Sequence, residues 1–289
     1  MIKVVPLESS RAALVIRIPR SFAKPHMVVF KGSSRFFSRN SAGKYQLDVA
    51  ELRAAFLISE TFAERARNFR MERLGHIIAG ETPVKLQDSP FAVLHLVPAS
   101  AFDPGSRLDI SPLLGQSDRL RPMIDYDSYS APRYNFDGLF SHASTEGRAS
   151  SYVQLFRNGT VEAVLADVQN PDYENKKMLP SGWLEKHFIE ALPIYVRAQR
   201  DVGVEPPVFL MFSLLGVSGY YMGIDGRHRL RRYDQSPIDR DALLVPEIVL
   251  EGFDQEASMT LRPAFDAIWN AAGWPRSMSY DENGTWRSQ

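Results

Sequence analysis

The sequence predicts an α+β protein, and three observations lead to this fold class. Short apolar strands with Gly-containing connections follow one another between residues 12 and 47, which is typical of a small antiparallel sheet. A helical pattern of apolar residues then extends from 49 to 78. The remainder of the chain alternates strand-like and helix-like segments, so a mixed α/β C-terminal domain is expected to follow.

The N-terminal sheet is expected to contain four short strands and two turns. The strands are 12–19, 27–30, 35–38 and 45–47, and the turns are 32–34 and 40–43. In the first strand, alternation places Leu14, Ile16 and Ile18 on one face and Val15 and Arg17 on the other.

A helix is expected to begin after Asp48. Asp48 and Glu51 have the spacing of a capping box, in which each side chain accepts a hydrogen bond from the backbone of the other residue. The pattern fits one bent helix or two helices in succession, and Gly80 is expected to end it. Residues 81–90 have the composition of a linker, which makes them the expected domain boundary.

The C-terminal region is predicted to combine buried strands with two amphipathic helices. The expected strands are 91–97, 152–156, 161–168, 208–217, 220–224 and 243–250, and the expected helices are 183–200 and 261–272. Residues 98–150 are expected to be irregular, and 275–289 are expected to form a polar tail. Asn158-Gly159 is the strongest hairpin signal in the chain. Pro193 is expected to kink the first helix.

Composition excludes several classes of site. The chain of 289 residues contains no cysteine, so it has no disulfide, no thiolate zinc site and no cysteine nucleophile. No apolar run approaches the roughly 20 residues that a transmembrane helix needs, and the start of the chain lacks the apolar segment of a signal peptide. We therefore expect a cytoplasmic protein that does not enter membranes.

Charge is strongly segregated along the chain. Residues 9–47 contain no Asp or Glu and carry eight Lys or Arg residues, a local charge of +8. The whole chain has a formal net charge of zero, so the rest of it sums to −8. A surface of one sign is what contact with a phosphate backbone requires, although a basic surface that is merely solvated would have the same composition.

Three features of this basic stretch favour nucleic acid as its partner. The charge has one sign, Gly and Ser stand at turns where backbone amides can approach phosphate, and aromatic residues alternate with the cations. Arginine suits phosphate because its guanidinium donates two parallel hydrogen bonds. The residues expected to bind DNA or RNA are Arg17, Arg20, Lys24, His26, Lys31, Arg35, Arg39 and Lys44.

No catalytic constellation is recognisable in the sequence. The phosphate-binding loops, the zinc-protease motif and the nucleophile-elbow motif are all absent. The six histidines are dispersed, and none of them pairs at a metal-ligand spacing. His95 lies inside an apolar strand, where a hydrogen-bonded core histidine is the expected role. Accordingly, we expect no catalytic residue, no cofactor and no metal site.

The same stretch resembles a known family. The matching elements are Ile18-Pro19-Arg20-Ser21, Lys24-Pro25-His26, Phe36-Phe37-x-Arg39-Asn40-Ser41-x-Gly43 and Glu51-Leu52-Arg53. Together they resemble the C-terminal part of the AlbA-like Schlafen DNA-binding domain of bacterial proteins, over about residues 1–57. The region from about 90 onward looks like the poorly characterised segment that follows this domain.

The resemblance implies a prokaryotic nucleic-acid-binding protein with a regulatory or defence role. It divides the chain into a truncated AlbA-like module at 1–57, a helical connector at 58–80 and a domain of unknown role at 90–289. Some family members cleave RNA with acidic residues in the first half of the module, which would precede Met1. Two alternatives therefore stay open: a fragment of a nuclease, and a protein-interaction or ligand-sensing module with the basic stretch as its docking face.

Overall fold

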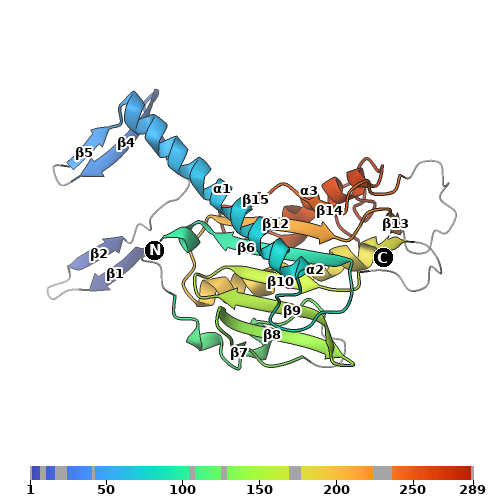
Figure 1. Ribbon diagram of the computed structural model, residues 1–289. Helices are drawn as coiled ribbons and strands as arrows, with labels where there is room; N and C mark the ends of the chain where they lie inside the picture. The colour runs from blue at the N-terminus through green and yellow to red at the C-terminus, as the bar shows by residue number, and fades with distance from the viewer. Residues whose placement is uncertain are drawn as a thin grey trace. The chain divides into compact units, whose positions relative to one another are not determined.

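The structure is a computed structural model that describes residues 2–6, 11–16, 25–40, 43–103, 108–124, 129–168, 177–223 and 236–287. It contains helices together with antiparallel sheets, as an α+β fold requires (Figure 1). The chain divides into two compact units, 1–60 and 61–289, which are described separately below. The division falls inside helix α1 (Val49–Ile78).

Unit 1 contains a two-stranded and a three-stranded antiparallel sheet and the first part of α1. Its strands are β1 (Ile2–Pro6), β2 (Ala12–Ile16), β3 (Met27–Phe30), β4 (Ser33–Asn40) and β5 (Gly43–Gln46). The β3–β4 turn consists of Lys31 and Gly32, both with positive φ, rather than of the expected 32–34. A two-residue turn of this kind matches the twist of the flanking strands, so β4 begins earlier than predicted.

The capping box at the start of α1 is confirmed. The Asp48 side chain accepts a hydrogen bond from Glu51 N at 2.8 Å, and the Glu51 side chain accepts one from Asp48 N at 3.0 Å. The pattern over 49–78 forms one helix, and Gly80 follows its end with φ of 75°. None of the described helices is long and apolar enough to cross a membrane.

Unit 2 is built on one large sheet. Its order is β14-β12-β6-β10-β9-β8-β7, with β15 also paired to β12 and every pairing antiparallel. The strands are β6 (Phe91–Pro98), β7 (Arg133–Tyr134), β8 (Gly138–Thr145), β9 (Arg148–Phe156), β10 (Val161–Leu165), β12 (Val208–Leu215), β14 (Ala242–Leu244) and β15 (Ile248–Leu250). A separate parallel pair joins β11 (Met178–Pro180) to β13 (Tyr221–Gly223).

Helices cover both faces of this sheet, which explains why its central strands β6 and β12 are buried along almost their whole length and are mostly apolar (Figure 1). On one face, α2 (Ser181–Asp201) and α3 (Ala257–Ala271) pack against the larger core cluster, which includes Leu94, Val153 and Phe212. The second part of α1 covers the other face through a smaller cluster that includes Leu74, Ile77 and Val164. Short 3-10 helices lie at Ala99–Phe102, Ser111–Leu113 and Ser117–Arg119.

Several predicted elements need correction. Residues 98–150, expected to be irregular, contain β8 and the start of β9. The expected strand 243–250 is interrupted, and its two halves pair separately with β12. The segment 220–224 pairs with β11 instead of the neighbouring buried strand. The pairings of β12 and of β11 join segments distant in sequence, which local periodicity does not report, whereas β8 and β9 form a local hairpin around Glu146 and Gly147 that the sequence analysis missed.

The expected boundary at 81–90 and the expected polar tail both belong to unit 2. Gln87 N donates to Ala149 O at 2.9 Å, so the supposed linker pairs with the start of β9. In the tail, the indole of Trp286 donates to the buried carboxylate of Glu185 on α2 at 3.0 Å. Both segments are held by hydrogen bonds whose partners lie far away in the sequence.

The predicted hairpin at Asn158-Gly159 joins β9 to β10. Glycine is needed at position 159 for two reasons, its backbone conformation and the close packing around it. Its φ is +84°, and a Cβ there would lie 2.6 Å from Val204 Cγ2 and 2.7 Å from Leu108 Cδ1. We expect Gly159→Ala to destabilise unit 2 by about 3 kcal/mol, from about 1 kcal/mol of backbone strain and about 2 kcal/mol of overpacking. Thermal or urea unfolding measures this loss.

Gly147→Ala is the matched control. Gly147 also has positive φ, of +82°, but a Cβ there meets nothing within 4 Å. Its substitution should cost only the backbone strain, about 1 kcal/mol. Equal losses at the two positions would contradict the packing role of Gly159.

Candidate nucleic-acid interface

The candidate site is one face of the β3–β4–β5 sheet. Alternate residues of a strand point to the same face, so Arg35, Phe37 and Arg39 of β4 lie together. Residues paired in register share a face as well. Val28 of β3 pairs with Arg35, and Lys44 of β5 pairs with Arg39. The two outer strands thus extend the surface that the cations of β4 begin.

We call this surface the basic face. Its residues are Val28, Phe30, Ser33, Arg35, Phe37, Arg39, Lys44 and Gln46. The opposite face of the sheet contacts the first part of α1. There the rings of Phe36 and Phe56 lie 6.3 Å apart, and Tyr45 Oη donates to Glu51 Oε1 at 3.0 Å. The basic face is therefore the side of the sheet that this helix does not cover.

Neutral groups hold the cations of the basic face in place. Arg35 Nε donates to Ser33 Oγ at 2.9 Å, and Arg35 Nη1 donates to Gln46 Oε1 at 3.4 Å. Lys44 Nζ lies 4.4 Å from the centre of the Phe37 ring. These contacts orient the side chains without neutralising them, so the positive charge is available to a ligand.

No acidic residue belongs to the basic face. Among the described residues, no carboxylate pairs with Arg35, Arg39 or Lys44, and all three side chains are exposed. Arg39 and Lys44 stand directly opposite each other in register, a like-charge pair that destabilises a free sheet. Phe30 on the same face is 67% exposed, a costly position for a phenyl ring in water.

The structure brings together only some of the residues that the sequence predicted. Arg35, Arg39 and Lys44 share the basic face, and Lys31 adjoins it in the β3–β4 turn, with Nζ 5.4 Å from the centre of the Phe30 ring. His26 is exposed immediately before β3 and makes contacts of its own. Arg17, Arg20 and Lys24 lie outside the described residues.

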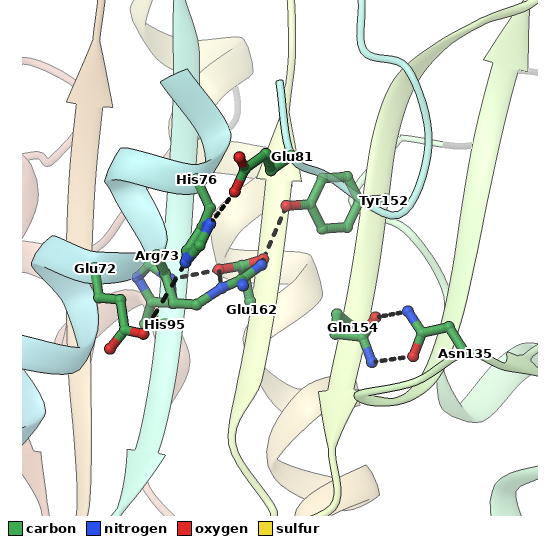
Figure 2. A network of polar contacts seen from close by, with 9 residues as sticks. All are labelled: Glu72, Arg73, His76, Glu81, His95, Asn135, Tyr152, Gln154 and Glu162. Atoms are coloured by element: carbon green, nitrogen blue, oxygen red, sulfur yellow. Dashed lines mark hydrogen bonds and ion pairs between the residues drawn. The ribbon is translucent and has the colours of Figure 1, made fainter. Parts of the chain in front are cut away.

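A second polar cluster lies between α1 and the sheet of unit 2 (Figure 2). Glu162 of β10 pairs in register with His95 on one side and Gln154 on the other. The guanidinium of Arg73, on α1, donates to both carboxylate oxygens of Glu162 at 2.9 Å. Tyr152 Oη adds a hydrogen bond to Glu162 Oε1 at 2.8 Å. One carboxylate thus connects the helix with three strands.

Burial and hydrogen bonding oppose each other at Glu162. Burial alone would raise the pKa of Glu162, but hydrogen bonds from His95 and Arg73 outweigh it and lower the pKa to about 2. His95 Nε2 lies 3.0 Å from Glu162 Oε2, while His95 Nδ1 has no hydrogen-bond partner in the described structure. The expected core histidine is therefore found, with one of its two nitrogens paired.

The residue types of this cluster are those of many active sites, but its burial indicates a structural role. Glu162, His95 and Tyr152 expose none of their surface to solvent, so no substrate reaches them. Sequence analysis missed Glu162, although a single acid inside the apolar strand Val161–Leu165 was a signal of a buried ion pair. Within the described part of the chain, no group of three or more metal-ligating side chains gathers.

No protein-family model, no curated protein and no solved structure matches the chain. These comparisons therefore assign no role to the basic face.

The buried ion pair leads to a prediction about acid stability. Because the pKa of Glu162 in the folded state is about 2, below its ordinary 4.5, its contribution to stability is complete above the ordinary value and is lost as the pH falls toward 2. We expect Glu162→Gln to destabilise unit 2 by about 3 kcal/mol at neutral pH, because Arg73 loses its charged partner. The difference from the wild type should shrink between pH 5 and pH 2 in chemical denaturation.

Glu247→Gln provides the matched control, because the partner of Glu247 is also on α1. Glu247 pairs with Arg67 of α1 at 2.6 Å, but the Arg67 side chain is 50% exposed. An exposed pair contributes less than about 1 kcal/mol. If both substitutions cost the same, the buried cluster does not fix α1 as described.

Proposed function

We propose that the chain binds nucleic acid through the basic face of unit 1. The observation that carries this proposal is the gathering of Arg35, Arg39 and Lys44 with Phe37 and Phe30 on one acid-free face, away from α1. The cations attract phosphate. Arg35 and Lys44 are oriented by neutral groups, so their charge is not neutralised within the protein. The two arginines offer the forked donors that phosphate oxygens accept in pairs.

The aromatic rings favour a single strand over a duplex. A phenyl ring on an open sheet stacks against an unpaired base, whereas the bases of a duplex are already stacked on one another. Phe30 and Phe37 share the basic face with the cations, so bases and phosphates of one strand would meet neighbouring side chains. Every base has a flat face, so this arrangement is tolerant of sequence.

We propose binding rather than cleavage by the described part of this chain. Hydrolysis of a phosphodiester needs an acid, a base or bound metal ions close to the strand. The basic face has no carboxylate, and the buried Glu162 cluster is closed to solvent. A nuclease activity would therefore require groups other than those of the basic face.

Salt dependence tests the contact with phosphate. If Lys31, Arg35, Arg39 and Lys44 each neutralise one phosphate, log K should fall against log salt with a slope of about −3 on single-stranded nucleic acid. Replacing Arg35, Arg39 and Lys44 together by Ala should weaken binding at least tenfold at low salt and bring the slope close to −1. Fluorescence anisotropy with a labelled oligonucleotide at several salt concentrations measures both quantities.

The control removes the same charge from unit 2. Lys186, Arg240 and Arg287 are cations on its surface, and their combined replacement by Ala should leave affinity and slope nearly unchanged. An equal loss in the control would mean that total charge, and not the basic face, attracts the ligand. Binding without salt dependence, or no binding, would contradict the proposal outright.

Stacking is tested separately at Phe30. Phe30→Leu keeps an apolar residue on β3 but removes the flat ring, so affinity for a single strand should fall about tenfold while affinity for a duplex changes little. Val29→Leu is the matched control, because Val29 directly precedes Phe30 in β3 and points to the other face.

A poly-glutamate of equal charge should bind more weakly than the oligonucleotide, and equal binding would favour an acidic protein as the partner.

A further inference from the structure

A groove in unit 2, distant in sequence from the basic face, has the character of a small-molecule site. It lies between the second half of α2, the segment that follows β15 and the first turn of α3, and it encloses about 470 Å³. Pockets that hold metabolite-sized ligands span roughly 300–1,000 Å³. The groove is therefore large enough for such a ligand.

The floor of the groove is apolar. Leu192 and Val196 of α2, Leu250 of β15 and Ala257 of α3 line it, and all four belong to the main core cluster. Gly252 stands in the wall, and a Cβ built on it would meet nothing within 4 Å. No described side chain therefore occupies the space next to Gly252, and the groove is open beside it.

The rim of the groove carries positive charge. Arg197 and Arg200 stand one turn apart on α2. Arg200 faces Asp254 at 3.7 Å, but both side chains are well exposed, so this pair is weak. No carboxylate in the described part of the chain pairs with Arg197. The acid at the rim, Asp201, is already engaged by Arg119 at 2.7 Å.

The amides at the start of α3 are not available to an anionic ligand in the groove. Glu256 caps this helix, and its side chain accepts hydrogen bonds from Ser258 N and Met259 N at 2.9 Å. A second anion at these amides would meet the carboxylate of Glu256. The head group of a ligand must therefore be held by the guanidinium groups of Arg197 and Arg200, on the other wall of the groove.

We propose that this groove binds a small amphipathic acid, with its carboxylate at Arg197 and Arg200 and its apolar body over Leu192, Val196 and Leu250. The apolar body would cover the exposed part of the apolar floor. The carboxylate would pair with the two arginines, which no buried carboxylate of the described residues neutralises. Both acyl and aryl carboxylates have this chemistry. This proposal does not rest on nucleic-acid binding, because none of the groove residues belongs to unit 1.

The test compares acids with their neutral analogues on the full chain. Isothermal titration calorimetry with decanoate and 4-phenylbutyrate should detect binding of at least one acid, and decanol or 4-phenylbutanol should bind about tenfold more weakly, since the charged head is missing. Preference for decanoate or for 4-phenylbutyrate tells whether the natural body is acyl or aryl. If neither acid binds, or if acid and alcohol bind equally, the proposal fails.

Variants locate the site. Arg197→Gln with Arg200→Gln should lower affinity for the acid about tenfold, to that of the alcohol, whereas Lys186→Gln removes a charge from α2 outside the groove and should have no effect. Gly252→Trp should abolish binding of acid and alcohol alike, and open space at its Cβ allows the chain to fold. Binding that survives Gly252→Trp would lie elsewhere and would overturn the assignment.

Discussion

The buried carboxylate of Glu162 is the constraint on which the arrangement of unit 2 depends. A charge without solvent contact is tolerated only when donors surround it, and here they come from α1 and from two other strands of the sheet. Because Arg73 of α1 donates to both oxygens of this carboxylate, the ion pair ties the helix to one place on the sheet. Apolar packing of Leu74 and Ile77 alone would allow α1 to slide. The polar cluster therefore supplies the register, and the apolar contacts supply most of the stability.

Unit 1 is stabilised differently. None of its described residues is fully buried, and Val4, Leu14 and Met27 are among the apolar side chains that it exposes. Its stability must come chiefly from strand pairing, from the capping box and from contacts such as Phe36 with Phe56. A ligand that bridges β3, β4 and β5 would therefore add a substantial share of the free energy that holds this sheet together.

Local signals were sufficient for the parts of the chain in which neighbours in sequence are neighbours in space. The capping box of Asp48 and Glu51 and the hairpin at Asn158-Gly159 were predicted from such signals and are confirmed. The sequence also predicted that cations lie on these strands. That Arg39 and Lys44 share one face became clear only from the register between β4 and β5. The Arg73–Glu162 pair and the groove beside Arg197 join residues far apart in sequence. No periodicity within one segment encodes such contacts, so they became visible only in the folded chain.

The facing pair of Arg39 and Lys44 makes unit 1 sensitive to ions in two opposite ways. Dissolved salt screens the repulsion between these side chains and so relaxes the empty sheet. In the complex proposed above, the same salt would compete with the polyanion for these side chains and so weaken binding. The repulsion between the two side chains is therefore strongest at low salt, which is also where a polyanion would be held most tightly. A polyanion bound as proposed would neutralise the facing pair and remove the repulsion that the empty sheet carries.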